Sequence, residues 1–305
     1  MLAPVVIFVY NRLEHTKKLV ESLAKNTLAD ESEIFIFSDA AKNENATQKV
    51  AEVREYIKTL EQSEYFKSVM VIYAENNQGL AKSVISGVDR IIREYGKVIV
   101  LEDDLVLSPH FLEFMNQSLE KYPKEPRVFS VSGFSRDIEY LRNLDVDMYF
   151  AVRAQSWSWG TWLDRWEKID WDVKDYNNFK YSLSARSTFN AGGDDMSSLL
   201  DRQQCGKINS WAIRFCYAQY KQNAYTVQPR ETLVENCGQD GSGTHCNYVR
   251  EKSELSQDTK WDLRPFNEDT EINIELKRTR KKIPWWKLLG SYLVFVVLKG
   301  KVPFV

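Results

Sequence analysis

The chain has 305 residues, of which 43% are hydrophobic and 28% are charged. This is the composition of a globular protein, and it excludes disordered and fibrous chains. The 41 Lys and Arg residues nearly balance the 43 Asp and Glu residues, leaving a net charge of −2. We therefore expect no nucleic-acid partner, because no overall positive field would attract one. The length suits one large domain or two small ones, at about 150 residues per domain.

Cysteine usage and the N-terminus both favour a reducing compartment. No Cys-x-x-Cys pair is present, so buried reduced thiols are expected. The apolar segment Met1–Tyr10 lacks a basic region and a small-residue cleavage site, which predicts a strand and not a signal peptide. We expect a cytoplasmic protein. The four cysteines are Cys205, Cys216, Cys237 and Cys246.

Strands and helices alternate through the first hundred residues. Short apolar runs predict strands, and apolar residues at helical spacing predict helices. The predicted strands are Pro4–Tyr10, Glu33–Ser38, Val69–Tyr73 and Lys97–Leu101, and the predicted helices are Glu14–Lys25, Ala46–Phe66 and Leu80–Tyr95. This alternation predicts an α/β fold with a mostly parallel sheet and helices on both faces.

The pattern is mixed α+β from about residue 128. Strands are predicted over 128–133, 148–152 and 225–227, and a helix over 210–220. Because the chain shows no repeat and no long linker, we expect this half to pack on the first sheet.

The C-terminal residues 271–305 differ from the rest of the chain. The basic cluster Lys277–Lys282 is followed by an apolar run that contains Trp285 and Trp286 and is too short to span about 30 Å of hydrocarbon. Each nearby basic residue contributes about 1 kcal/mol of attraction to an anionic leaflet. The segment is therefore predicted to be an amphipathic tail, peripheral on the inner face of the cytoplasmic membrane. The alternative is a helix docked on the domain or on a partner chain.

Polar residues follow each predicted parallel strand. Ligands bind at the carboxyl ends of such strands, which predicts a site shared by Asn11, Asp39, residues 76–79 and the acidic run Glu102–Asp104. Three acids between apolar runs repel one another, and their burial is tolerable only if a cation or hydrogen-bond donors compensate the charge. Mn²⁺ or Mg²⁺ suits such carboxylates and takes its other ligands from water and a diphosphate. A helix cap is the alternative, although it explains only one acid.

Four segments carry a resemblance to a known family. Tyr10-Asn11-Arg12, Asp39, Asn77–Ala81 and Leu101–Phe111 resemble the nucleotide-sugar half of GT-A glycosyltransferases. They look most like glycosyltransferase family 2 and the N-acetylglucosaminyltransferase I group, whose acidic motif is also Glu-Asp-Asp. The resemblance extends through Ser156–Trp162 to the loop Asn236–His245.

The resemblance implies a GT-A fold and a metal-dependent transfer of sugar from a nucleotide diphosphate donor, UDP in particular. Residues 1–127 would bind the nucleotide sugar, and residues 128–270 would form the acceptor and catalytic half of the same domain. The acceptor would be a glycan or a lipid-linked sugar, as in bacterial surface polysaccharide biosynthesis. The expected enzyme class is a hexosyl- or N-acetylhexosaminyltransferase.

The same resemblance assigns residues to the donor. Arg12 and Asp39 would hold the nucleotide, Asp103 the ribose and Asp104 the metal. The full expected nucleotide-sugar set is Tyr10, Asn11, Arg12, Asp39, Gln78, Gly79, Lys82, Glu102, Asp103, Trp159 and Gly160. For the four tryptophans between 157 and 166, core packing is the alternative to sugar stacking, and we favour it for at least two.

The loop Gln239–His245 contains two glycines among small polar residues, which lets backbone N–H groups wrap an anion. We predict a lid over the diphosphate, formed with Gly241 and Ser242. His245 is predicted to bind either the metal or the diphosphate, although a lone loop histidine is often only a polar surface residue.

The catalytic base is where the sequence departs from the family. Aligning Trp211–Phe215 with the family's Trp-Asp helix puts Ala212 at the acid position. The substitutes are Asp195 first, then Asp194 and Asp164. The missing acid leaves inversion or retention open and keeps a noncatalytic, membrane-tethered nucleotide-sugar-binding module as one alternative. A sugar-1-phosphate nucleotidyltransferase, which would also have an α/β sheet and a metal-binding carboxylate, is the other.

Overall fold

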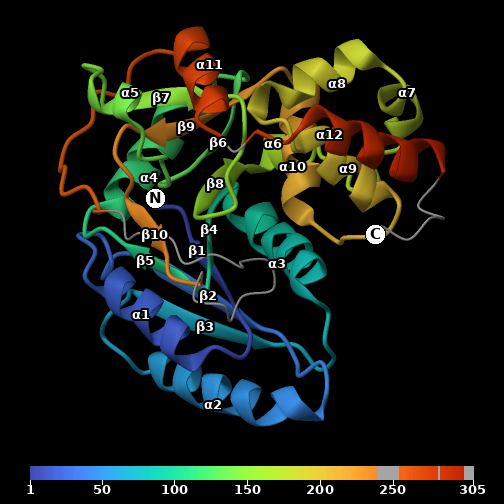
Figure 1. Ribbon diagram of the computed structural model, residues 1–305. Helices are drawn as coiled ribbons and strands as arrows, with labels where there is room; N and C mark the ends of the chain where they lie inside the picture. The colour runs from blue at the N-terminus through green and yellow to red at the C-terminus, as the bar shows by residue number, and fades with distance from the viewer. Residues whose placement is uncertain (239–253, 281, 299–305) are drawn as a thin grey trace.

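A computed structural model describes residues 1–238, 254–280 and 282–298. In this part of the chain the central sheet has eight strands, in the order β3-β2-β1-β4-β8-β6-β9-β7 (Figure 1). The first four strands in that order are parallel, whereas β8 is antiparallel to both β4 and β6. The predicted α/β class, with a mostly parallel sheet between helices, is confirmed. The strands are β1 (Val5–Val9), β2 (Glu33–Ser38), β3 (Ser68–Tyr73), β4 (Lys97–Glu102), β6 (Val128–Val131), β7 (Met148–Ala151), β8 (Trp159–Trp162) and β9 (Tyr225–Pro229).

Both faces of the sheet are covered, which explains the continuous apolar runs of its strands. Alternate β1 residues enter two separate cores: Ile7 lies in one and Phe8 in the other. The first core is closed by α1 (Leu13–Ala24), α2 (Glu44–Leu60) and α4 (Phe111–Lys121), and the second by α3 (Leu80–Tyr95) and α10 (Trp211–Lys221). Helix α2 ends earlier than predicted, because the chain turns back after Leu60 and buries Phe66.

Short helices fill the space beside the second core. They are α6 (Leu163–Trp166), α7 (Tyr176–Lys180), α8 (Leu183–Phe189), the 3₁₀ turn η1 (Asn190–Gly192) and α9 (Met196–Gln204). In a second, two-stranded sheet, β5 (Leu105–Leu107) pairs with β10 (Val234–Asn236) and thereby brings the residues after β10 to the end of β4.

Helix α11 (Thr270–Arg278) covers the outer strand of the sheet. The edge strand β7 would otherwise present unpaired backbone groups. Asp269 accepts from the N–H of Phe150 at 2.7 Å, and the Asn273 side chain accepts from the N–H of Val152 and donates to the carbonyl of Phe150. Ile272 and Leu276 form a third, small core with Tyr149 and with α5 (Glu139–Arg142).

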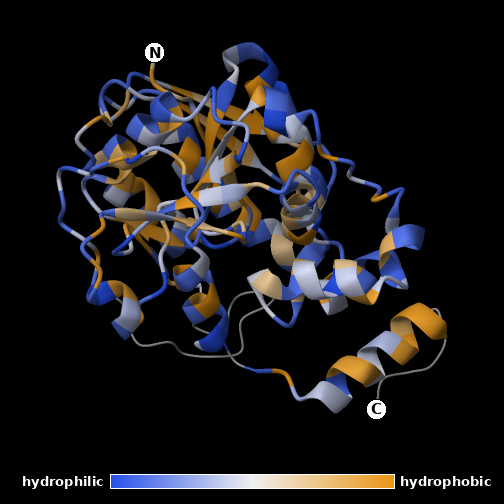
Figure 2. Ribbon diagram, turned by 90° about the horizontal axis from the view of Figure 1, so that it is seen from above, coloured by the Kyte–Doolittle hydropathy of each residue, from blue (hydrophilic) through white to orange (hydrophobic). Residues whose placement is uncertain are grey.

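The tail forms α12 (Trp285–Tyr292) and a π-helical turn η2 (Leu293–Val297), which pack on α9. Ser291 hydrogen-bonds Ser198 at 2.6 Å, and the Cys205 thiol donates to the Phe295 carbonyl. The opposite side of the tail exposes apolar residues at the periphery of the molecule (Figure 2). Among the described residues, no helix has the length and apolarity to cross a membrane. The described cysteines, at 205, 216 and 237, are free thiols.

Candidate functional site

An acidic cluster lies at the carboxyl end of β4. Strands β1 and β4 are parallel and in register, with Phe8 beside Glu102, so Arg12 reaches the two acids that follow β4. Its guanidinium forms ion pairs with Asp103 and, at 3.0 Å, with Asp104. The structure thus brings together Arg12, Glu102, Asp103 and Asp104.

The cluster carries more negative charge than Arg12 compensates. Burial is the largest effect on the pKa of Glu102, and with repulsion from Asp104 and Asp103 it raises that pKa to about 8. Burial likewise raises the pKa of Asp103, although Arg12 opposes the shift. Three carboxyl groups beside one guanidinium form an oxygen-rich, electron-rich site, which suits a hard divalent cation that also binds phosphate oxygens.

The described residues alone do not form a complete metal site. Among them, no group of three His, Cys, Asp or Glu side chains is placed to hold an ion. The second predicted ligand, His245, lies outside the described residues, as do Gly241 and Ser242 of the predicted lid. A complete ligand set therefore requires groups beyond this cluster, such as donor phosphates or the lid.

The segment that leads into the predicted lid is anchored on the acids. The Cys237 N–H donates to the Asp104 carbonyl at 2.8 Å, and the Asn236 amide donates to the Asp104 carboxylate at 3.3 Å. Gly238 packs so closely that a Cβ atom there would overlap the Asp104 carboxylate and lie 2.8 Å from Arg12 Nη1. The sequence analysis did not predict these contacts, although it did predict a lid in the loop that follows the Asn236-Cys-Gly motif.

Asp39 organises the turn that precedes α3. Its carboxylate accepts from the N–H groups of Gln78 at 2.8 Å and Gly79 at 2.9 Å, and from the Asn77 amide at 3.0 Å. Gly79 has φ +73°, a left-handed conformation that favours glycine. The predicted contact of Asp39 with a nucleotide base stays a prediction.

The other donor-side residues lie around this turn and the end of β1. The Tyr10 hydroxyl accepts from the N–H of Lys42 at 3.0 Å. Asn11 is half-buried and Lys82 is exposed at the start of α3.

Trp159 and Gly160 are buried in the structure and face the core, which corrects their assignment to the sugar site. The Trp159 ring lies 5.0 Å from Trp211 and Phe215, and it is 1% exposed. A Cβ on Gly160 would lie 2.9 Å from the Val98 carbonyl, so the close approach inferred there is to β4 and not to a ligand. Core packing, favoured for at least two of the four tryptophans, holds for Trp159, Trp162 and Trp166.

None of the three candidate bases has a contact with the acidic cluster. Because β8 runs antiparallel to β4, Asp164 lies beside the start of β4, at the opposite end from Glu102. Asp195 pairs with Arg153 at 2.7 and 3.0 Å, and Asp194 lies 3.7 Å from Lys277. Burial opposes the charge on Asp195, but hydrogen bonds from Arg153 outweigh it and lower the pKa of Asp195, which makes it a weak base.

The first turn of α10 contacts the acidic cluster. This turn contains Trp211, the residue aligned with the tryptophan of the family's Trp-Asp helix. The Trp211 side chain interacts with Glu102 and lowers its pKa, acting against the burial effect. With Ala212 next in sequence, this turn contributes no carboxylate. The sequence alignment located the helix, but it could not show that Trp211 itself contacts an acid.

Comparison with known proteins agrees with this geometry. Residues 5–193 match the family model of Glycosyl transferase family 2. No curated protein matches the chain. The structure of GalNAc-T7 with UDP, GalNAc and Mn²⁺ is similar, with 11% identity and a TM-score of 0.50, over 99% of this chain and 52% of that one. With the family match, this likeness confirms the predicted GT-A fold.

Two further solved structures are similar. S. aureus TarS 1-349 has 12% identity and a TM-score of 0.47, over 79% of this chain and 62% of that one. The mannosyltransferase PcManGT from Pyrobaculum calidifontis, in complex with GDP-Man and Mn²⁺, has 14% identity and a TM-score of 0.38, over 53% of this chain and 44% of that one. The chain therefore spans less than two thirds of the length of each of these three proteins.

Proposed function

Because the chain belongs to Glycosyl transferase family 2, we propose that it transfers a sugar from a nucleotide diphosphate donor, UDP-linked in particular, to a glycan or lipid-linked acceptor. The observation that carries this proposal is the acidic cluster at the end of β4, in which three carboxyl groups lie together and Arg12 forms ion pairs with two of them. A bound Mn²⁺ or Mg²⁺ would stabilise the charge on the departing diphosphate.

The residues of the site have distinct roles in this proposal. Asp104 holds the ion, and Asp103 contacts the ribose. Arg12 fixes both carboxylates in position through its ion pairs. Asp39 holds the turn that ends at Gly79, the residue before α3, so the N-terminus of that helix is directed at the donor.

We also propose that the tail attaches the protein to the inner face of the cytoplasmic membrane, where acceptors for surface polysaccharide are assembled. Its support is the exposed apolar face of the tail, where Trp285 is 74% and Trp286 57% exposed, next to basic residues. The double change Trp285→Ser with Trp286→Ser should reduce sedimentation with anionic vesicles. If the double variant and the unchanged protein sediment equally with these vesicles, attachment through this face is contradicted.

A donor panel tests the proposed reaction. We expect the protein with Mn²⁺ to release nucleoside diphosphate slowly from one nucleotide sugar, and Asp104→Asn to abolish the release. Glu120→Gln is the matched control, because Glu120 lies at the other end of β4 beside Lys97 and its side chain is 78% exposed. Its release rate should equal that of the unchanged protein.

Two results would contradict the proposal. Donor binding without release from any nucleotide sugar would favour the noncatalytic module. Pyrophosphate formed from a nucleoside triphosphate and a sugar phosphate would favour the nucleotidyltransferase.

A further inference from the structure

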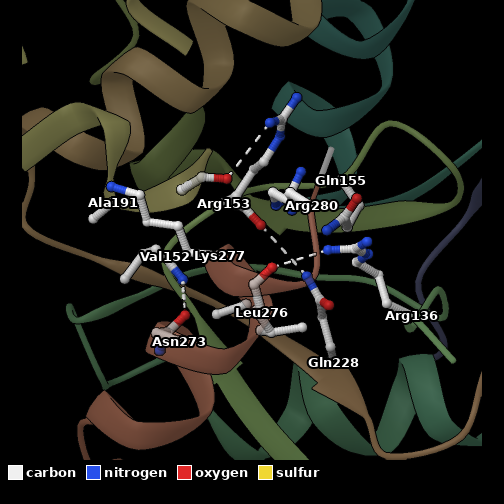
Figure 3. A pocket seen from close by; sticks show the side chains of 12 residues that line it. Arg136, Val152, Arg153, Gln155, Ala191, Gln228, Asn273, Leu276, Lys277 and Arg280 are labelled. Atoms are coloured by element: carbon white, nitrogen blue, oxygen red, sulfur yellow. Dashed lines mark hydrogen bonds between the residues drawn. The ribbon is translucent and has the colours of Figure 1, made fainter. Parts of the chain in front are cut away.

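The two outer strands of the central sheet differ in how they are covered. On one side, the polar side chains of α11 bond the backbone of β7 and of the residue after it, and Asn273 accepts from the N–H of Val152 (Figure 3). The other outer strand is β3, on the opposite side of the sheet (Figure 1). Among the described residues, β2 is the only strand that pairs with it. We call the side of β3 that faces away from β2 the open edge.

Strand β3 lacks the features that usually protect the edge of a sheet. Such edges carry charges, prolines or bulges, or they lie under another element. The sequence of β3, Ser-Val-Met-Val-Ile-Tyr, has no charge and no proline, and its six residues pair with β2 in continuous register. Met70 is 50% and Tyr73 41% exposed, so apolar side chains lie uncovered along a strand that is free to pair. These properties favour a partner strand at the open edge.

The backbone groups at the open edge follow from the hydrogen bonds on the other side of β3. Just after the strand, the N–H of Ala74 donates to the carbonyl of Ser38 on β2 at 3.0 Å. Backbone groups of alternate residues point to the same side of a strand, so those of Met70 and Ile72 also point to β2. The residues that present their N–H and C=O groups to the open edge are therefore Val69, Val71 and Tyr73.

An antiparallel copy of the same strand fits these groups in one register. Residues that exchange two hydrogen bonds across an antiparallel pair stand directly opposite each other, so both must face the partner strand. With Val71 of each copy at a twofold axis, Val71 bonds the other Val71, and Val69 bonds Tyr73. All three edge residues of both strands are then paired, whereas a shift of one or two residues leaves edge groups without partners. Met70 packs against Ile72 of the second copy in this register.

The charges beside β3 agree with the same register. Lys67 lies just before the strand, where its N–H donates to Ser32, and Glu75 lies just after it. The register places Lys67 opposite Glu75 at both ends of the paired strands, and opposite charges across a strand pair stabilise it. Both side chains are accessible: Glu75 is exposed, and that of Lys67 is 56% exposed although it pairs with Glu33 of its own chain.

We propose that β3 pairs antiparallel with β3 of a second copy of this chain, centred on Val71, so that one sheet continues through both copies. A single pair of strands buries less surface than a standard protein interface, so we expect a dissociation constant of about 10 µM. The pairing uses no residue of the donor site. The dimer and the proposed glycosyltransferase activity are therefore tested separately.

Sedimentation velocity at concentrations on either side of that constant measures the dimer. The unchanged protein should pass from monomer to dimer as its concentration rises. Lys67→Glu and Glu75→Lys should each weaken dimerisation about tenfold or more, because like charges then face each other at both ends of the paired strands. The control Lys207→Glu changes an exposed lysine between α9 and α10 and should dimerise normally. A monomer at every concentration, or equal dimerisation in all four proteins, would overturn the proposal.

An equimolar mixture of the two charge variants tests the antiparallel register. In a mixed dimer each end again joins an acid to a lysine, so dimers should form with about the affinity of the unchanged protein. The double variant Lys67→Glu with Glu75→Lys should dimerise by itself for the same reason. Recovery in both experiments also shows that the charge variants are folded. If neither the mixture nor the double variant recovers, this register is wrong.

A cysteine at the centre of the pairing gives an independent measurement. The Cα atoms of a hydrogen-bonded antiparallel pair lie about 5.5 Å apart, which is within the range of a disulfide. Mild oxidation should therefore link two Val71→Cys chains. Ser68→Cys is the control, because residue 68 is exposed but lies away from its own copy across the axis. It should link no more than the unchanged protein, whose own cysteines set the background. Equal linking of the two variants would overturn the register.

The exposed tail is a second surface through which copies could associate, and one control separates the two. Trp285→Ser with Trp286→Ser changes only α12 and should leave dimerisation in solution unaltered. A monomeric double variant would overturn β3 as the interface. Release of nucleoside diphosphate by Lys67→Glu should equal that of the unchanged protein. Absence of release in every protein would count against the proposed function, whereas normal release by a protein that stays monomeric would count against the strand pairing alone.

Discussion

The acidic cluster shows how far single residues could be predicted. Glu102, Asp103 and Asp104 were identified from their position after an apolar strand, because parallel strands place their carboxyl ends together. The partner of the two aspartates was not identified, since nothing in the sequence around Arg12 shows that it spans to β4. Trp159 was misassigned because a core aromatic residue and a sugar platform have the same sequence signature.

Arg12 is the cation that makes the cluster tolerable without metal. Arg12→Gln should lower the free energy of unfolding by about 3 kcal/mol, because it leaves two buried carboxylates uncompensated. Added Mn²⁺ should recover part of this loss by mass action, and chemical denaturation with and without the ion measures both effects. Arg90→Gln, an exposed change on α3, is the control. An Arg12→Gln protein of unchanged stability in chelator would contradict the assigned role.

Gly238 is constrained by the same acids. Gly238→Ala should weaken Mn²⁺ binding about tenfold, because the added Cβ overlaps the Asp104 carboxylate and displaces it. Titration with Mn²⁺ measures the change. Gly290→Ala, which adds a Cβ into open space, should bind Mn²⁺ normally. Equal affinities in the two variants would show that the Gly238 contact is not needed for the ion.

Strands and helices were predicted correctly where the apolar periodicity of the sequence agrees with the burial of the element in the structure. Strand Glu33–Ser38 and helix Leu80–Tyr95 occur with the predicted bounds, because each presents a periodic apolar pattern to a core. The short helices over 176–204 were not predicted, since a helix of five to nine residues is stabilised by its packing and not by its own sequence. The tail was predicted to lie on a membrane; its contact with α9 matches the alternative of a docked helix, and membrane attachment stays a proposal.

Helix α11 is fastened to the sheet by polar side chains. Asn273→Ala removes three hydrogen bonds, to Val152, Phe150 and Asp269, and should lower the free energy of unfolding by about 1–3 kcal/mol. Denaturant unfolding checks this value. Ile274→Ala, at a neighbouring position that is 54% exposed, should change stability by less than about 0.5 kcal/mol. If the two variants are equally stable, the bonds to β7 do not hold the helix.

For the whole molecule, the acidic cluster predicts how stability depends on pH. The pKa of Glu102 rises from 4.5 to about 8 on folding, so the folded protein holds this proton more tightly than the unfolded chain does. In chelator, stability should therefore fall as the pH rises from about 4.5 to about 8, and then level off. Urea unfolding across this range should show a smaller decline for Glu102→Gln. Parallel curves for the two proteins would contradict the raised pKa.

The polar side chains of α11 also affect how the molecule behaves among its own copies. With the backbone groups of Phe150 and Val152 already bonded to Asp269 and Asn273, another polypeptide finds no template there for cross-strand polymerisation. A substitution that loosens α11 therefore threatens solubility as well as stability, because it weakens the small core around Tyr149 and uncovers the edge of the sheet at the same time.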